Sequence, residues 1–211
     1  DKYMKRLFDL TLVIVSLPLW GSVVLICYIV NVLLEGRPGF YSSNRHVGIE
    51  KIIEMKKFRV MKKNIDKTLN RASIPTDSQA FLNLPKDRNI YTNFGLIIEK
   101  FGVTELPQFF SVIKSDMSIV GSRPLPNDVH NLLKAKFPSI ALKRYDSKCG
   151  MTGLPQLIGR DFISDEERLN LEASYCAWCN TNYNFIVDLK IITYTILFVL
   201  GLKKRTSIDK A

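Results

Sequence analysis

One uninterrupted apolar run near the N-terminus dominates the hydrophobic pattern. From Leu10 to Leu34 there are 25 residues without a charged side chain. A straight helix of this length would reach about 37 Å, which exceeds a bilayer hydrocarbon core of roughly 30 Å. The run is too long for a cleaved signal peptide and lacks a clear A-x-A cleavage site. The pattern predicts a membrane-embedded helix, and a straight span is its simplest form.

Two features of this run favour a helix that enters the membrane and returns. Pro18 lies inside the run, and proline removes a backbone hydrogen bond and kinks a helix. Ser16 and Ser22 are close enough to satisfy the backbone groups that a kink frees in lipid. Both flanks are also basic, whereas a crossing helix shows a bias towards one side. The basic residues are Lys2, Lys5 and Arg6 before the run, and Arg37 and Arg45 after it. We expect a re-entrant helix over residues 1–36 that bends at Pro18, with the straight span as the alternative.

The rest of the chain has the pattern of an α+β, helix-rich, single compact domain. Strand-like segments are expected at 38–45 and 51–61, and helices at 94–100, 105–114, 127–136, 165–178 and 184–202. The polar, turn-rich stretch at 64–92 predicts a variable loop. We therefore divide the chain into the re-entrant helix (1–36), a cytoplasmic domain with membrane-interface helices (37–205) and a tail (206–211).

The apolar segment near the C-terminus is short. "IITYTILFVLGL" (191–202) has only 12 residues, too few to span a bilayer, and Lys203, Lys204 and Arg205 follow it. This pattern favours an amphipathic helix at the membrane interface, and a buried core helix is the alternative.

The charge balance points to an anionic partner. The 211 residues include 30 Lys or Arg and 20 Asp or Glu, for a net charge of +10. Residues 51–71 carry eight basic side chains against Glu54 and Asp66, which suits anionic headgroups. Nucleic acid is not the expected partner, because the chain lacks a recognisable binding module and contains the long apolar run.

Cys176 and Cys179 form a lone CxxC. A zinc site would need two further ligands at suitable spacing, and the chain has only two histidines, His46 and His130. We expect free thiols in a reducing cytosol and no metal or redox chemistry at these cysteines.

Four stretches in the remainder of the chain carry a family resemblance. They are "KKFRVM" (56–61), "TELPQFFSVIKSDMSIVGSRPL" (104–125), "KCGMTGLPQLIGR" (148–160) and "VDLKII" (187–192). In this order, behind the apolar run, they resemble the bacterial sugar transferases, which are monotopic polyprenol-phosphate phosphoglycosyl transferases. The resemblance extends over about residues 4–202.

This resemblance implies an activity, a cofactor and a location. The enzyme would transfer a sugar 1-phosphate from a UDP-sugar to a membrane polyprenol (undecaprenyl) phosphate and release UMP. That step initiates the assembly of bacterial cell-surface glycans, such as exopolysaccharide or lipopolysaccharide. The enzyme would lie on the cytoplasmic face of the bacterial inner membrane. Its reaction would pass through a covalent sugar phosphate on the aspartate of an Asp-Glu pair, with Mg²⁺.

The chain departs from the family at this pair, where it has Thr104 and Glu105. Glu105 matches the second acid, an expected Mg²⁺ ligand, and Thr104 stands where the nucleophile would be. Thr104 is a good N-cap for a helix that begins at Glu105, or a weak nucleophile that Glu105 would have to activate. Alternatively, the protein is an inactive or altered homologue that binds a ligand or scaffolds a partner, or the threonine was introduced to trap a substrate. Glu99, where the family usually carries arginine, is a candidate second carboxylate.

Several further residues are candidates for substrate binding. The expected phosphate ligands are Lys57, Arg59, Arg123, Lys148 and Arg160, and Gln156 matches its motif. Lys148 keeps the charge of the family's arginine but not its bidentate geometry. Asp161 and Asp188 are additional candidates, and an exposed face of the last helix is the alternative for Asp188. The expected partners are a UDP-sugar, polyprenol phosphate and membrane lipids, and a homodimer is one way to cover exposed apolar surface.

Overall fold

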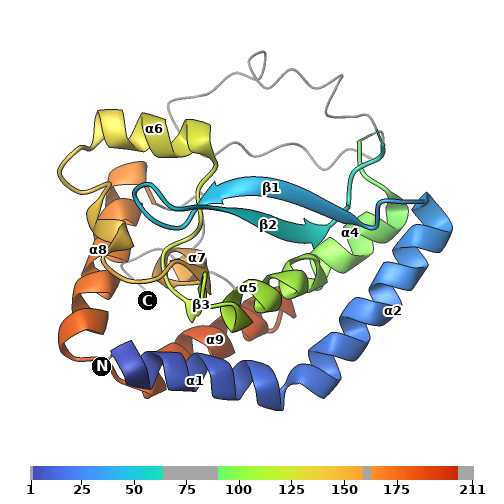
Figure 1. Ribbon diagram of the computed structural model, residues 1–211, viewed down its shortest axis with the longest axis horizontal. Coiled ribbons are helices and arrows are strands. Elements are labelled where there is room, and N and C mark those ends of the chain that lie inside the picture. Colours follow the sequence, from blue (N-terminus) through green and yellow to red (C-terminus); the bar gives the residue numbers. More distant parts are fainter. Residues whose placement is uncertain (1, 64–89, 159–162, 204–211) are drawn as a thin grey trace.

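The computed structural model describes residues 2–63, 90–158 and 163–203. The apolar run forms two helices, α1 (Lys2–Val15) and α2 (Leu17–Glu35), and the chain changes direction between them (Figure 1). Pro18 lies in the first turn of α2, where a missing N–H leaves no intrahelical bond unmade. The run is therefore not one continuous helix.

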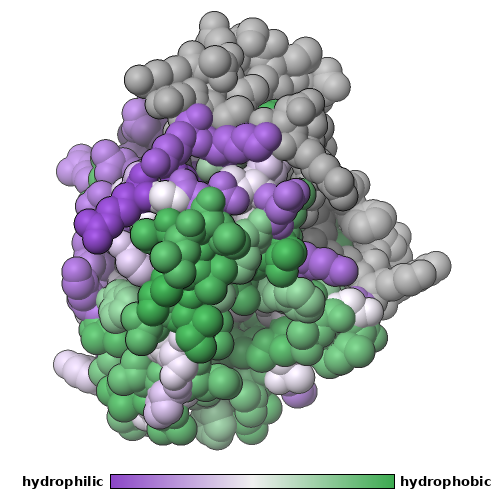
Figure 2. Space-filling model, turned by 90° about the vertical axis from the view of Figure 1, so that its right-hand side faces the viewer, coloured by the Kyte–Doolittle hydropathy of each residue, from purple (hydrophilic) through white to green (hydrophobic). Residues whose placement is uncertain are grey.

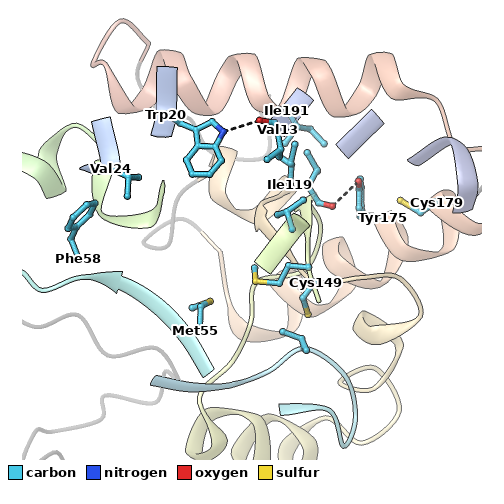
Figure 3. Close-up of a cluster of buried hydrophobic side chains, with 14 of the residues drawn as sticks. Val13, Trp20, Val24, Met55, Phe58, Ile119, Cys149, Tyr175, Cys179 and Ile191 are labelled. Atoms are coloured by element: carbon cyan, nitrogen blue, oxygen red, sulfur yellow. Dashed lines mark hydrogen bonds between the residues drawn. The ribbon is translucent and has the colours of Figure 1, made fainter. Parts of the chain in front are cut away.

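The backbone groups at the α1–α2 junction have partners. Ser16 donates its N–H (3.1 Å) and its Oγ–H (2.6 Å) to the Leu12 carbonyl. Trp20 donates its indole N–H to the Val13 carbonyl at 2.9 Å (Figure 3). Ser22 Oγ donates to the carbonyl of Pro18 at 2.6 Å. Both serines thus bond to the local backbone, and Trp20 adds a contact that the sequence pattern did not indicate.

Two small sheets and a set of helices make up the remainder. β1 (Phe40–His46) and β2 (Ile52–Phe58) form an antiparallel hairpin, and β3 (Ser118–Val120) pairs in parallel with β4 (Gly150–Thr152). The α-helices are α4 (Asn93–Lys100), α5 (Phe109–Ile113), α6 (Asn127–Lys136), α7 (Leu154–Ile158), α8 (Asp165–Thr181) and α9 (Phe185–Val199). Two 3₁₀ helices are η2 (Val103–Gln108) and η3 (Lys143–Tyr145). The predicted α+β, helix-rich class is confirmed, and most of the predicted 64–92 loop lies outside the described residues.

The segment predicted as one helix over 105–114 differs from expectation. The 3₁₀ helix η2 occupies its first part and α5 its second. Gly102, with φ of +67°, is the N-cap of η2, so Thr104 lies inside the 3₁₀ helix. The prediction that Thr104 caps a helix beginning at Glu105 is therefore wrong. A helix-breaking Pro107 within the segment explains why a regular α-helix starts only after it.

The main core lies where α1, α2, β3 and α9 meet (Figure 3). Buried side chains from all four elements meet there: Val13, Trp20, Val120 and Ile191. A second, smaller cluster packs α6 against α8 through Leu133 and Leu169. The main core also includes Met55 and Phe58 of β2, and Val103 and Leu106 of η2 pack against it, so it holds the hairpin and η2 in position.

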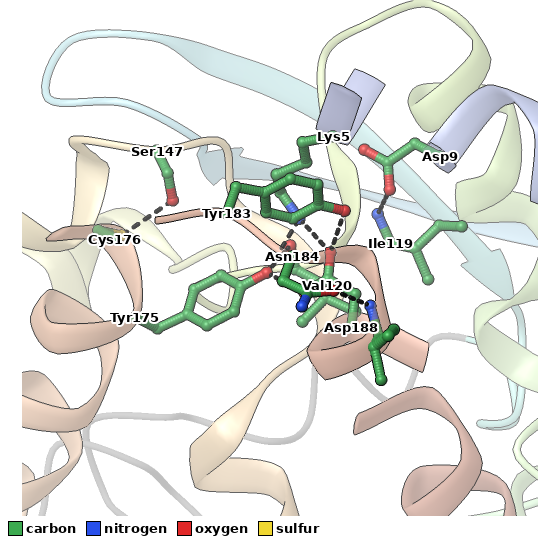
Figure 4. A network of polar contacts seen from close by, with 11 residues as sticks. Lys5, Asp9, Ile119, Val120, Ser147, Tyr175, Cys176, Tyr183, Asn184 and Asp188 are labelled. Atoms are coloured by element: carbon green, nitrogen blue, oxygen red, sulfur yellow. Dashed lines mark hydrogen bonds and ion pairs between the residues drawn. The ribbon is translucent and has the colours of Figure 1, made fainter. Parts of the chain in front are cut away.

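A buried polar network fastens α1 to the C-terminal helices (Figure 4). Lys5 Nζ lies 2.7 Å from Asp188 Oδ2, and that carboxylate also accepts from Tyr175 (2.6 Å) and Tyr183 (3.1 Å). Asp9 accepts the backbone N–H of Ile119 at 3.1 Å. The Asp188 side chain is fully buried, so its expected place on an exposed face or in the substrate site is wrong. Its role is to tie α1, α8 and α9 together.

The outer face of α2 is apolar and exposed. Among the described residues, α2 is the one helix that is long and apolar enough to cross a membrane, and 17% of its most apolar window is buried. Figure 2 shows a broad hydrophobic area on this side of the molecule, with hydrophilic residues above it. Exposed apolar side chains on other elements include Phe101, Phe110, Ile196 and Leu200. So much contiguous apolar surface indicates contact with a membrane or another apolar partner.

The Lys5–Asp188 pair generates a prediction about stability. Asp188→Ala should lower the free energy of unfolding by about 3 kcal/mol, because it leaves the Lys5 ammonium buried without its counter-charge. Chemical unfolding in detergent, followed by tryptophan fluorescence, measures this. Asp128→Ala, at an exposed position in the first turn of α6, is the control and should cost at most about 1 kcal/mol. Equal losses in the two variants would show that the buried pair contributes nothing special.

Candidate anion-binding cleft

A cleft of about 1340 Å³ opens between the β1–β2 hairpin, η2, α4 and the C-terminal half of α9. Two carboxylates, Glu99 and Glu105, line it among the described residues. Seven cationic side chains also line it: Arg37, Arg45, Lys57, Arg59, Lys62, Lys63 and Arg123. This excess of five positive charges in a concave, partly desolvated space favours a polyanionic ligand.

The opposite wall of the cleft is apolar. It includes Phe101 after α4, and Ile192, Ile196 and Val199 on α9. Some of these side chains are also exposed at the surface, Phe101 by 53% and Ile196 by 53%. The cleft therefore suits a ligand, or a pair of ligands, with both anionic and apolar parts.

Glu105 is the charged centre of the cleft. Lys57 Nζ lies 2.6 Å from Glu105 Oε1, and Arg123 Nη2 lies 3.3 Å from the same oxygen. The three side chains are each 20–29% exposed, which leaves them accessible to a ligand. Lys57 comes from β2, Glu105 from η2, and Arg123 from the loop after β3. Three segments far apart in sequence thus meet at one carboxylate oxygen.

A buried ion pair positions Arg123. Arg144 Nε lies 2.7 Å from Glu172 Oε2, and both side chains are at most 2% exposed. Arg144 donates to the Arg123 carbonyl at 2.6 Å, and the Arg123 N–H donates to Glu172 at 3.3 Å. Burial is the largest single influence on the pKa of Arg144 and lowers it, but Glu172, Cys149 and Tyr145 together raise it, and the net pKa is raised. Neither residue was predicted, because no local pattern marks a pair that forms between η3 and α8.

The pKa of Lys57 is lowered, and the causes act in opposite directions. Burial is the largest cause and lowers it; the Glu105 carboxylate raises it, and the nearby Arg123 lowers it. Glu105 therefore favours the protonated form of Lys57, against the effects of burial and of Arg123.

Arg59 differs from the other cations because it also touches a helix end. Its Nη2 donates to the carbonyls of Glu35 and Gly36, both at 2.8 Å, at the C-terminal end of α2. The residue is 8% exposed and lines the cleft. Arg59 thus connects the cleft with the apolar helix pair.

The structure brings together most of the predicted site. Thr104, 9% exposed, lines the cleft with Lys57, Arg59, Glu105 and Arg123. Glu99, the candidate second carboxylate, lines it as well.

Two predicted ligands do not line this cleft. The exposed Lys148 donates to the backbone carbonyl of Ser115 at 2.9 Å and to the Ser115 hydroxyl, which holds it near the end of α5. Gln156 belongs to α7 and is not among the lining residues. Arg160 and Asp161 lie outside the described residues. A substrate-binding role for Lys148 and Gln156 therefore stays a prediction from the motifs alone.

The cysteines and the cleft differ in their capacity to bind a metal ion. Cys176 is buried in α8, where its Sγ donates to the Arg144 carbonyl (3.2 Å) and accepts from Ser147 (3.0 Å). Over residues 2–63, 90–158 and 163–203, no group of three or more His, Cys, Asp or Glu could hold a metal. Mg²⁺, however, is usually bound by one or two carboxylates together with substrate phosphates. Glu105, with Glu99 in the same cleft, fits a Mg²⁺ ion shared with a ligand.

Comparison with known proteins agrees with this arrangement. Residues 1–202 match the model of the family described as "Bacterial sugar transferase". The chain is 34% identical to "Uncharacterized sugar transferase EpsL" of Bacillus subtilis, over 93% of this chain and 87% of that protein. It is 32% identical to "Galactosyl transferase CpsE" of Streptococcus agalactiae, over 93% of this chain and 42% of the relative. It is 30% identical to "Undecaprenyl-phosphate galactose phosphotransferase" of Salmonella typhimurium, over 95% of this chain and 41% of that protein. The chain thus spans less than half of the last two relatives.

The opposing influences on Lys57 generate a prediction about its titration. Glu105→Gln removes the carboxylate that raises the pKa of Lys57, so this pKa should fall further below its usual value. More of the amine is then neutral at pH 8–9, and its acylation by an amine-directed reagent should be faster in the variant. Peptide mass spectrometry measures the rate at Lys57, with the exposed Lys114 as internal control. An unchanged rate at Lys57 would contradict the assigned ion pair.

Proposed function

Because this chain belongs to the bacterial sugar transferase family, we propose that it transfers a sugar 1-phosphate from a UDP-sugar to undecaprenyl phosphate. UMP leaves, and the product is a lipid-linked sugar diphosphate that initiates cell-surface glycan assembly. The observation that carries this proposal is the cationic cleft centred on Glu105, which joins Lys57 and Arg123 beside an apolar wall.

The cations of the cleft would bind the phosphates of both substrates. A UDP-sugar carries two negative charges on its diphosphate, and charge-assisted hydrogen bonds from Lys57 and Arg123 would hold and polarise it. Glu105 fixes the positions of these two cations before the ligand arrives. Mg²⁺, held by Glu105, would further neutralise the diphosphate when bound.

Thr104 is the residue in the cleft from which covalent transfer would start. Its Oγ would attack the sugar-linked phosphorus, with its proton passing to Glu105 and UMP leaving. An oxygen of undecaprenyl phosphate would then displace the threonine and take over the sugar phosphate, and Thr104 would recover its proton. Because two cations already bind Glu105, this carboxylate is a weakened base, which makes the step slow.

The same observation supports a second candidate function. A carboxylate that two cations neutralise, next to a threonine, forms a phosphate-binding site with little capacity to activate a nucleophile. The protein would then be a non-catalytic homologue that binds a nucleotide sugar or scaffolds a membrane partner.

The exposed apolar helices support a location of the cleft at a membrane. The apolar α1–α2 pair would enter one leaflet of the inner membrane from the cytoplasm and return, as a re-entrant element bent near Pro18. The exposed apolar residues of α4 and α9 beside the cleft would then lie at the interface, where undecaprenyl phosphate presents its headgroup.

UMP release tests the two functions against each other. Purified protein in nanodiscs is incubated with Mg²⁺, undecaprenyl phosphate and a panel of UDP-sugars, beside Thr104→Asp and Glu105→Gln. We expect UMP release that requires undecaprenyl phosphate, at least about a hundredfold faster in Thr104→Asp, because a carboxylate needs no base to attack phosphorus. Glu105→Gln should release none.

The other outcomes discriminate between the candidates. A parent protein that is silent while Thr104→Asp turns over is a binding protein on a competent scaffold. Silence of both, with UDP binding intact, would contradict the transferase proposal for this chain.

A further inference from the structure

Outside the Glu105 cluster, Arg59 is a buried residue whose guanidinium has two distinct surroundings. Its Nη2 is fully engaged by the Glu35 and Gly36 carbonyls of the α2 C-terminus, at 2.8 Å each. Its Nε and Nη1 are buried and, within the part of the chain that the structure describes, have no hydrogen-bond partner. The residue is 92% buried yet lines the cleft.

Unmade hydrogen bonds on a buried cation are costly. A guanidinium has five N–H donors and cannot lose its proton, so buried donors without acceptors carry a substantial desolvation cost. The cost is removed when an acceptor arrives, and a phosphate oxygen in the cleft is the acceptor that a guanidinium binds best. The unsatisfied donors of Arg59 therefore point to an anionic ligand.

The backbone around Arg59 extends its reach into α2. Asn31, which is fully buried on α2, donates Nδ2 to the carbonyls of Gly39 (3.1 Å) and Arg59 (3.0 Å). The Arg59 N–H donates to the Gly39 carbonyl at 3.0 Å. Arg59 thus holds the last turn of α2 through its side chain, and it holds Asn31 of α2 and Gly39 at the start of the hairpin through its backbone. A shift of Arg59 towards a ligand therefore has to act on the last turn of α2 and on the start of the hairpin.

We propose that Arg59 couples occupancy of the cleft by a phosphate to the docking of the α2 C-terminus. A phosphate oxygen accepts from Nε or Nη1, fixes the guanidinium, and so strengthens the hold of Nη2 on the carbonyls of Glu35 and Gly36. Coupling is reciprocal, so a firmly docked α2 also raises the affinity for the phosphate. The membrane-facing helix pair would thereby sense whether a nucleotide is bound. The inference rests on the proposed function for the identity of the ligand, a nucleoside diphosphate.

Hydrogen exchange tests this coupling in the intact protein. The Gly36 N–H, which donates to the Val32 carbonyl at 2.9 Å, reports opening of the last α2 turn. In nanodiscs, saturating UDP should slow exchange over residues 32–37 by at least about fivefold, the low end of typical coupling energies. Inorganic pyrophosphate, which lacks the nucleoside, should give the same protection if phosphate contact alone is responsible.

Two variants that remove the same charge separate coupling from binding. Arg59→Gln and Lys57→Gln each take one cation from the cleft, but only Arg59 bonds to the end of α2. Both should weaken UDP binding about tenfold. UDP at saturation should still protect residues 32–37 in Lys57→Gln and should no longer do so in Arg59→Gln. Arg59→Lys, which keeps the charge but not the fork, replaces Arg59→Gln if that variant does not fold, with the same expected loss.

The possible failures are distinguishable. If UDP binds and UMP is released but exchange at 32–37 does not change, the coupling is wrong and the proposed function stands. If protection persists in both Arg59 variants, Arg59 is not the coupling residue. If neither UDP nor pyrophosphate binds, the phosphate site at Arg59 and the transferase proposal are both overturned.

Discussion

The structure depends on how an exposed apolar helix pair is fastened to a polar domain. α1 and α2 contribute buried side chains such as Val13 and Trp20 to the core, but much of their surface is apolar and exposed. Such a pair would not stay in place through hydrophobic contact alone once lipid is available on its outer face, because lipid is as apolar as the core. Directional polar contacts hold it at both ends. Lys5 and Asp9 bind the domain at the α1 end, and Asn31 and Arg59 connect the α2 end.

These fastenings determine where the cleft lies. The α2 end is held by Arg59 of the segment after β2, and β2 also carries Lys57 into the cleft. The cationic cluster is therefore fixed relative to the apolar helices by one short stretch of chain. The ion pair between Lys5 and Asp188, in the first turn of α9, fixes the position of α9 and so of the apolar wall that this helix contributes. A cationic cleft with an apolar wall next to an exposed apolar face suits the proposed transfer from a soluble nucleotide sugar to a lipid phosphate.

The sequence predicted the elements better than their local chemistry. The predicted bounds of α4, α6, α8, α9 and the two hairpin strands lie within three residues of those in the structure. Lys57, Arg59, Glu105 and Arg123, which the family motifs single out, all line one cleft.

Prediction from the sequence failed where the interaction partner of a residue comes from a distant segment. Lys148 bonds to Ser115 instead of facing the cleft, and Asp188 is buried against Lys5. Thr104 was expected at an N-cap, but Pro107 and the left-handed Gly102 impose a 3₁₀ helix. The Arg144–Glu172 pair behind Arg123 has no local signal, because only the folded chain places η3 beside α8.

The central claim is that the α1–α2 pair enters and leaves the same face of the membrane, which keeps the cleft at that face. Single cysteines at exposed positions on either side of the pair, Lys2→Cys and Glu50→Cys, test it directly in a Cys27→Ala background, since the other three cysteines are buried. Labelling uses a membrane-impermeant maleimide on right-side-out and inside-out bacterial membrane vesicles. The account predicts that both positions react only in inside-out vesicles, where the cytoplasmic face is accessible. Reaction of the two positions from opposite faces would show a straight span and contradict the account.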